Sequence, residues 1–235
     1  MKQITAILLA GTVAIFMSAC GGGGSSDPVD PTEPNTNQYD LRTWVDTAGY
    51  HIDGEGTITA PTGTLNVDGF YRSFYEGTSI APTGETVHNH FVTLSLTAAT
   101  TSFTQYVNST TYEGNLVYVD NVTDGIVCET PLALADLTPV PTDAQVGYIS
   151  DIIPLECSDG SYITNVIKLS DAGGGNAELS IISNTYVSQG GALESSETDS
   201  ITVTPTMSMV NAEITGSIPA DGITFALSST FITQL

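Results

Sequence analysis

The chain has 235 residues and a formal net charge of -22, because 26 Asp and Glu residues stand against only 4 Lys and Arg. Surfaces that bind nucleic acid need clustered basic residues, so this charge balance excludes a nucleic-acid partner. With 40% hydrophobic residues, the chain is long enough to bury the core of at least one domain. The acidity itself favours a solvated surface and does not specify a fold.

Residues 1–19 have the organisation of a secretory signal peptide. Lys2 supplies a positive start, residues 4–16 form a largely apolar run, and small residues precede Cys20. The run is too short and wrongly flanked for a membrane-spanning helix, so we expect it to be removed on export.

The segment Met17-Ser18-Ala19-Cys20 resembles the lipobox of type II signal peptides, in which Leu, then Ala or Ser, then Gly or Ala usually precede the cysteine. Met17 stands where Leu is usual. The resemblance implies a bacterial lipoprotein, with a diacylglyceryl group on the Cys20 sulfur and a fatty acid such as palmitate on its amine, which together hold the protein at a membrane. Gly21 stands where inner-membrane lipoproteins often carry Asp, which implies the outer membrane and leaves open the side that the protein faces.

Residues 20–37 contain Gly, Ser, Pro, Asn, Thr and acidic residues with almost no apolar side chain. Such a segment cannot offset the entropy lost on ordering, so we expect a lipidated and flexible linker. Residues 38–235 are predicted to form a single domain.

From residue 38 onward, apolar and polar residues alternate with a period of two, which is typical of half-buried β-strands, and no long helical pattern is present. The clearest predicted strand is Ile201–Met209, in which Pro205 indicates an edge or a bulge. The other predicted strands are, in chain order, His51–Thr59, Phe70–Glu76, Val87–Leu96, Ser102–Val107, Leu116–Val119, Ile163–Leu169, Ala177–Val187 and Ile223–Phe231.

Asp-Gly pairs support the strand assignment, because this dipeptide tolerates the positive φ angles of tight hairpins. The pairs are Asp53-Gly54, Asp68-Gly69, Asp124-Gly125, Asp159-Gly160 and Asp221-Gly222. Strands at this spacing with Gly-rich turns predict an all-β fold, either an antiparallel β-sandwich or a β-barrel. A jelly-roll and a lipocalin-like barrel are the specific alternatives.

Cysteine usage agrees with export. With Cys20 lipidated, Cys128 and Cys157 remain as an even pair in an oxidising compartment, so we predict a disulfide between them. The segment 128–157 is rich in proline and shows little alternation. We therefore predict a long loop, or excursion, whose two ends are joined by the disulfide. A short helix is expected only at Pro131–Leu137.

His88 and His90 are the candidate metal ligands. Strand periodicity places both on one face, and jelly-roll metalloenzymes use an H-x-H pair to hold Zn or Fe. The cupin family follows this pair with a Glu, but Leu94 and Ser95 stand at those positions here. His51 or Glu85 would have to complete the site. The alternative is that both histidines hydrogen-bond locally or face solvent.

Tyr71 and Tyr75 are the candidate glycan-binding residues, because exposed tyrosine rings on a sheet face stack on sugars. The alternative is ordinary cross-strand packing, which strand-favouring aromatic residues usually provide.

Two further patterns bear on ligands. Residues 120–125 have the acidic start and the Gly of an EF-hand loop, but Val122 and Pro131 occupy ligand positions, so only looser calcium binding by acidic loops remains open. Leu41-Arg42-Thr43-Trp44 resembles the G-x-W start of lipocalins, whose barrels enclose small apolar ligands, with Arg42 in place of the glycine. Trp44 as a core anchor is the alternative.

The sequence contains no G-x-S-x-G, H-E-x-x-H, P-loop or Rossmann glycine pattern, so it identifies no catalytic residue. We therefore predict a lipid-anchored envelope protein that acts as a binding or structural β domain, with no cofactor expected and an envelope protein or glycan as partner. A metal-dependent barrel enzyme using His88 and His90 and a glycan-binding module are the alternatives.

Overall fold

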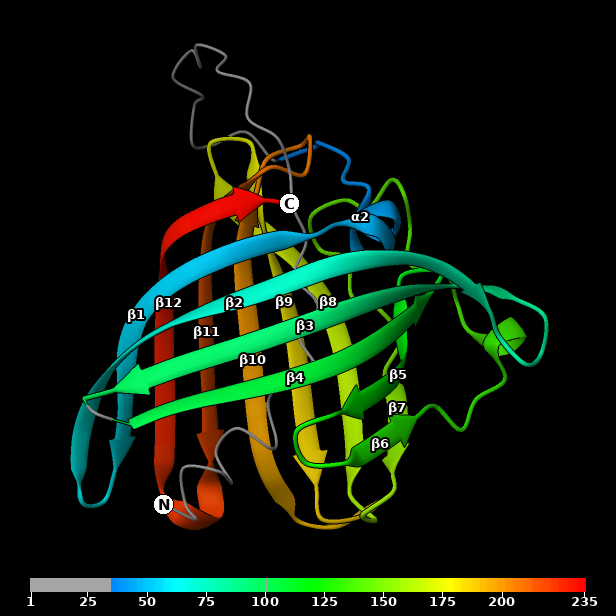
Figure 1. Cartoon of the computed structure of the whole chain (residues 1–235). Helices are drawn as coiled ribbons and strands as arrows, with labels where there is room; N and C mark the ends of the chain where they lie inside the picture. Colours follow the sequence, from blue (N-terminus) through cyan, green and yellow to red (C-terminus); the bar gives the residue numbers. More distant parts are fainter. Residues whose placement is uncertain (1–34, 100) are drawn as a thin grey trace.

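The computed structural model describes residues 35–99 and 101–235, which form one closed β-barrel (Figure 1). Each of its twelve strands pairs antiparallel with its neighbours in the chain, and β1 closes the barrel by pairing with β12. The prediction of an all-β antiparallel fold is confirmed. Because every strand pairs with its sequence neighbours, the barrel is of the up-and-down type rather than a jelly-roll or a sandwich.

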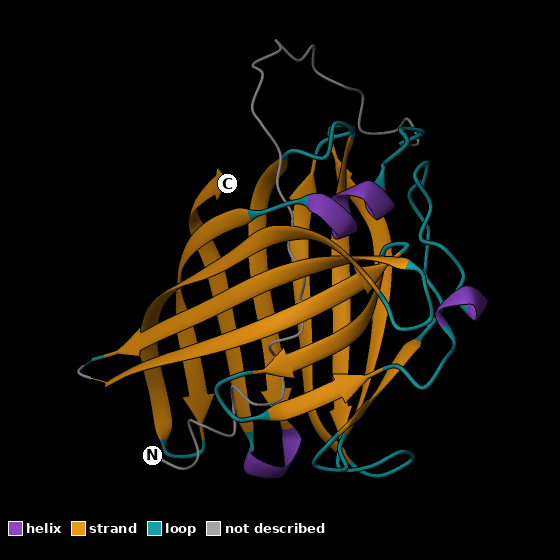
Figure 2. Cartoon of the chain, turned by 45° about the vertical axis from the view of Figure 1, so that its right-hand side comes forward, coloured by secondary structure: helices purple, strands orange, loops and turns teal. Residues whose placement is uncertain are grey.

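The longest strands are β2, with 18 residues, and β3, with 13. Their bounds are β1 Tyr50–Ala60, β2 Gly63–Ile80, β3 Thr86–Ala98, β4 Thr101–Tyr112, β5 Asn115–Asn121, β6 Ile126–Glu129, β7 Ile153–Cys157, β8 Tyr162–Gly173, β9 Asn176–Tyr186, β10 Leu193–Val203, β11 Met209–Ile218 and β12 Ile223–Gln234. The helical segments are α2 Leu41–Thr47 and the 3-10 turns η1 Leu134–Asp136 and η2 Pro219–Asp221. Figure 2 shows these segments at the ends of the barrel and on a loop outside it, so the wall is formed by strands.

Alternation along the strands separates a lumen face from a water face. On β9, Ala177, Leu179 and Ile181 are buried in the barrel, while the intervening residues, such as Ser180, are partly exposed. The strands from β2 to β4 cross obliquely in front of those from β8 to β11 (Figure 1), so their inward side chains pack against each other. The lumen is therefore the hydrophobic core of the protein.

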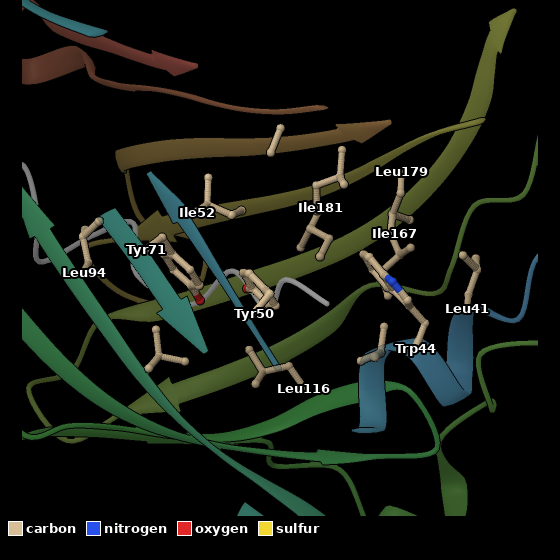
Figure 3. Packing of buried hydrophobic residues seen from close by; sticks show 14 of the residues in the cluster. Leu41, Trp44, Tyr50, Ile52, Tyr71, Leu94, Leu116, Ile167, Leu179 and Ile181 are labelled. Carbon is tan, nitrogen blue, oxygen red and sulfur yellow. The ribbon is translucent and has the colours of Figure 1, made fainter. Parts of the chain in front are cut away.

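Helix α2 lies at the end of the barrel where β1 begins (Figure 1). Asp40 caps it by accepting a hydrogen bond from the Thr43 backbone N–H at 3.0 Å. Trp44 is buried and points toward Ile167 and Leu179 of the barrel (Figure 3). The helix was not predicted, because its seven residues are too few to display a helical period.

The carboxyl group of Asp46 fastens α2 to the β4–β5 hairpin. It accepts hydrogen bonds from the Thr111 hydroxyl at 2.7 Å and from the Gly114 backbone N–H at 3.1 Å. Burial raises the pKa of Asp46, and these two hydrogen bonds oppose that shift. No helix among residues 35–99 and 101–235 has the length and apolar character needed to span a membrane.

The predicted strand Ile201–Met209 is wrong, because the chain reverses inside it. β10 ends at Val203 and β11 starts at Met209, with Pro205 in the turn between them. The turn is closed by a hydrogen bond from the Thr204 N–H to the Ser208 carbonyl at 2.9 Å, and Met207 adopts a φ of 61°. The alternating residues 201–209 therefore comprise the end of β10, a turn and the start of β11.

The Asp-Gly pairs divide into two groups. Those at Gly125, Gly160 and Gly222 have positive φ angles and form turns, as predicted. Gly54 and Gly69 instead lie inside β1 and β2, where they are register partners. A Cβ on Gly69 would lie 2.3 Å from the Ser95 carbonyl oxygen, so this glycine allows close approach of two strands rather than a turn.

The predicted disulfide is confirmed. Cys128 and Cys157 are direct partners on β6 and β7, with an S–S distance of 2.09 Å. The segment between them leaves the barrel wall, contains η1 within the predicted helical region, and packs Leu137 against Val117 and Ile153 in a second, smaller hydrophobic cluster.

The N-terminal predictions lie mostly outside the described residues. The signal peptide, the lipidation of Cys20 and the linker as far as residue 34 belong to this part of the chain. Of the described residues inside the predicted linker, Asn35 and Asn37 contact the barrel. The Asn35 side chain donates to the Asn176 carbonyl at 2.8 Å, and the Asn37 side chain donates to the Gly175 carbonyl at 2.9 Å.

Candidate functional site

Strand β10 carries two acidic side chains into the lumen. Ser195, Glu197 and Asp199 alternate in phase with Ile201 and Val203, and all five are buried. Asp199 is 0% exposed and Glu197 is 8% exposed. The inner face of β10 is thus polar over its first half and apolar over its second half.

The neighbouring strands extend this polar surface. Glu197 is the register partner of Ser183 on β9, and Ser183 is the register partner of Asn165 on β8. The Ser183 hydroxyl donates a hydrogen bond to the Asn165 side-chain oxygen at 2.7 Å. We refer to the five buried polar residues as the lumen cluster: Asn165, Ser183, Ser195, Glu197 and Asp199.

Tyr71 of β2 faces the lumen cluster from the opposite wall. Its ring stacks on that of Tyr50 with centroids 5.7 Å apart, and both rings are buried (Figure 3). Burial raises the pKa of Tyr71 well above its usual value, and the charges of Asp199 and Glu197 raise it further. The Tyr71 hydroxyl therefore lies in the electrostatic field of both carboxyl groups.

Burial governs the protonation of the acidic pair. It raises the pKa of Glu197 and of Asp199 well above their usual values, and the charge of Glu197 adds to the shift at Asp199. Within the described part of the chain, neither oxygen of the Asp199 carboxyl group has a hydrogen-bond partner. A buried carboxylate without a partner is costly, so burial favours the protonated form of both groups.

Other inward polar groups also lack partners among the described residues. They are the hydroxyls of Ser73, Ser109 and Ser195 and the side-chain amide nitrogen of Asn165. Native proteins bury few unsatisfied polar groups, and those that they keep usually have a role. The lumen therefore presents donors and acceptors that the side chains around them do not use.

An apolar cavity of about 30 Å³ is lined by residues of β1, β2, β3, β11 and β12, next to the strand that carries the acidic pair. Ile214, which is the register partner of Asp199 on β11, lines it together with Tyr71 and Leu94. By volume it has room for a short alkyl group.

The structure brings His88 and His90 together with Tyr75. The Tyr75 hydroxyl lies 3.1 Å from the His88 Nδ1 atom, and the Tyr75 ring centroid is 5.4 Å from that of His90. His90 is fully buried, and burial together with the charge of His88 lowers its pKa to about 4. His51, a suggested third ligand, lies instead 3.0 Å from Asp53.

No group of three or more His, Cys, Asp or Glu side chains in residues 35–99 and 101–235 is arranged to hold a metal ion. The hypothesis of Zn or Fe at His88 and His90 stays a prediction, which metal analysis of protein purified without a His tag would check.

Tyr71 and Tyr75 do not form the exposed face that stacking on sugars requires. Tyr71 is only 4% exposed and points into the barrel, and Tyr75 is partly buried against the two histidines. The cross-strand packing that was the alternative for these residues matches their positions.

The suggested calcium loop and the segment that resembles a lipocalin start form a turn and a helix. Asp124 is held at the β5–β6 turn by the Asn121 side chain at 3.0 Å, and Asp120 lies 3.3 Å from the Asn108 amide. Calcium binding there stays a prediction. Trp44 is buried in α2, so the segment that resembles a lipocalin start forms a helix here.

Sequence reasoning missed the lumen cluster because both faces of residues 194–200 are polar, which hides the period of two. One signal was present, since Ser195, Glu197 and Asp199 are in phase with Ile201 and Val203.

Comparisons with known proteins do not identify a relative. A scan of protein-family models, a search of curated proteins and a search of solved structures found no significant match to this chain.

Proposed function

We propose that this protein is a lipid-anchored binding protein of the bacterial cell envelope, whose barrel holds a small polar ligand in its lumen. The observation that carries the proposal is the buried Asp199 carboxyl group, which has no hydrogen-bond partner among the described residues. The polar groups beside it come from three adjacent strands, so they form one continuous surface on which a ligand can be oriented.

The cellular location rests on the N-terminal sequence and on the disulfide. The resemblance of Met17-Ser18-Ala19-Cys20 to a lipobox supports acylation of Cys20 and attachment to the outer membrane. The Cys128–Cys157 bond is consistent with an oxidising compartment. Incorporation of a labelled fatty acid that is lost in the Cys20→Ser variant would support the anchor, and a thiol left bare in the native protein would refute it.

Cysteine accessibility tests whether the lumen admits a ligand. The acylated protein should contain no free thiol, so a cysteine introduced by Ser195→Cys can be followed alone with iodoacetamide, a small neutral reagent. We expect this lumen thiol to react in the folded protein, because a binding site must exchange with solvent.

Two matched variants calibrate this measurement. Ser196→Cys places the thiol on the partly exposed side of the same strand and should react faster. Ala177→Cys places it in the apolar part of the lumen, where Ala177 is 0% exposed, and should react only on unfolding. If the Ser195→Cys thiol is protected as strongly as the Ala177→Cys thiol, the lumen is a closed core and the proposed function is wrong.

A further inference from the structure

We propose that the lumen ligand is a small organic ammonium ion, bound by the carboxyl groups of Glu197 and Asp199 with the ring of Tyr71 facing its charge. This inference rests on the proposed function and specifies the class of ligand.

The acidic pair lacks a positive partner from the described chain. Arg42 pairs with Glu113, Arg72 lies over the Phe74 ring at 4.1 Å, and Lys168 is exposed to solvent. These are all the Lys and Arg residues in the described part of the sequence. An uncompensated buried carboxylate is strongly unfavourable, so a cation from outside is the complement that this site accepts.

The surroundings favour an organic cation over a metal ion. A metal centre needs several ligands, and the described residues place no third His, Cys, Asp or Glu beside this pair. Tyr71 and Tyr50 instead offer aromatic surface, which attracts ammonium groups by cation–π interaction. The cavity of about 30 Å³ beside Ile214 is apolar and suits a short alkyl group attached to the charged nitrogen.

Binding of a cation should be linked to proton release. The titratable side chain of Tyr71 on β2 faces the pair, since the charges of Asp199 and Glu197 raise its pKa, and Tyr50 on β1 stacks on its ring. The adjoining strands contribute Ser183 and Ile181 from β9, and Gly216 and Ile214 from β11. The carboxyl groups must lose protons to hold the cation. Affinity should therefore rise by about tenfold per pH unit for each proton released.

Titration calorimetry with propylammonium chloride tests the inference. We expect saturable binding to the full-length protein, with proton release that appears as a dependence of the heat on buffer ionisation. Glu197→Gln and Asp199→Asn keep the shape of each side chain and should weaken binding by about tenfold or more. Asp68→Asn removes the same charge from an exposed position on β2 and should leave binding unchanged.

Two other probes separate the possible outcomes. Propanol has the same alkyl chain without the charge and should not bind, while calcium chloride tests the metal-ion alternative. If calcium but not propylammonium binds in an Asp199-dependent manner, the ligand class is wrong. If no cation binds although the Ser195→Cys thiol reacts in the folded protein, the inference fails and the proposed function stands. If that thiol is also protected, both fail.

Discussion

At the scale of single residues, the lumen combines a hydrophobic core with a few groups that stability alone does not explain. Replacing Asp199 by an apolar residue would remove an unsatisfied group, so its presence favours a role in binding. His90 is also a polar residue that is fully buried in the barrel. Strand periodicity placed His90 but not Asp199, because both faces of residues 194–200 are polar and hide the alternation.

The Asp199→Asn variant should be more stable than the wild-type protein at alkaline pH when no ligand is bound. The folded-state pKa of Asp199 is raised above its usual value of 3.8, so the folded state loses stability as the pH rises through that raised pKa. We expect a gain of about 1 to 3 kcal/mol in the free energy of unfolding near pH 8. Urea denaturation at several pH values measures it.

Asp68→Asn is the control, because Asp68 is exposed and should change stability by less than about 0.5 kcal/mol. Equal effects of the two substitutions would mean that the buried position of Asp199 has no energetic consequence.

His90 should titrate in the folded protein at about pH 4, well below the usual value of 6.5. Its lowered pKa means that the unfolded state binds the proton more readily, so this residue destabilises the fold as the pH falls from 6.5 toward 4. NMR spectra of the imidazole recorded against pH would show the midpoint. A midpoint near 6.5 would contradict the burial described here.

At the scale of elements, alternation predicted strands well where one face is apolar and poorly elsewhere. β3, β8 and β9 were predicted with small errors at their ends. β6 and β7 were missed because they are short and lie beside the proline-rich excursion. The error at Ile201–Met209 has another cause, since a turn of five residues preserved the phase of the alternation across two strands.

Helix α2 should stabilise the barrel mainly through Trp44. Its ring is 4% exposed, and Trp44→Ala would leave a cavity against β8 and β9, which we expect to cost about 3 to 5 kcal/mol. Thr47→Ala on the exposed side of the same helix should cost less than about 0.5 kcal/mol. Thermal unfolding of both variants compares them, and a similar loss in each would show that α2 does not pack as described.

The disulfide should contribute to stability by restricting the conformations open to the unfolded chain. Its cysteines are 29 residues apart, which corresponds to about 3 to 4 kcal/mol in the chain-entropy model. A double Cys128→Ala, Cys157→Ala variant should show this loss in denaturant titrations. Unchanged stability would mean that the excursion is held by its other contacts, including the cluster around Leu137.

At the scale of the whole molecule, the sequence predicted an all-β fold and the disulfide, and it left barrel and sandwich as alternatives. Closure depends on the pairing of β1 with β12, which are the first and last strands in the sequence. No local pattern encodes such a contact. The approach of Tyr71 to the acidic pair likewise depends on β2 crossing over β10 (Figure 1). The candidate site is therefore a property of the closed barrel rather than of a motif.

A crystal structure of the protein soaked in propylammonium chloride tests most directly whether this barrel holds a ligand in its lumen. We expect one ammonium ion between the Asp199 carboxyl group and the Tyr71 ring, with its alkyl chain toward Ile214. A lumen filled only by its own side chains in the soaked crystal, with the ion absent or bound on the outer surface, would contradict it.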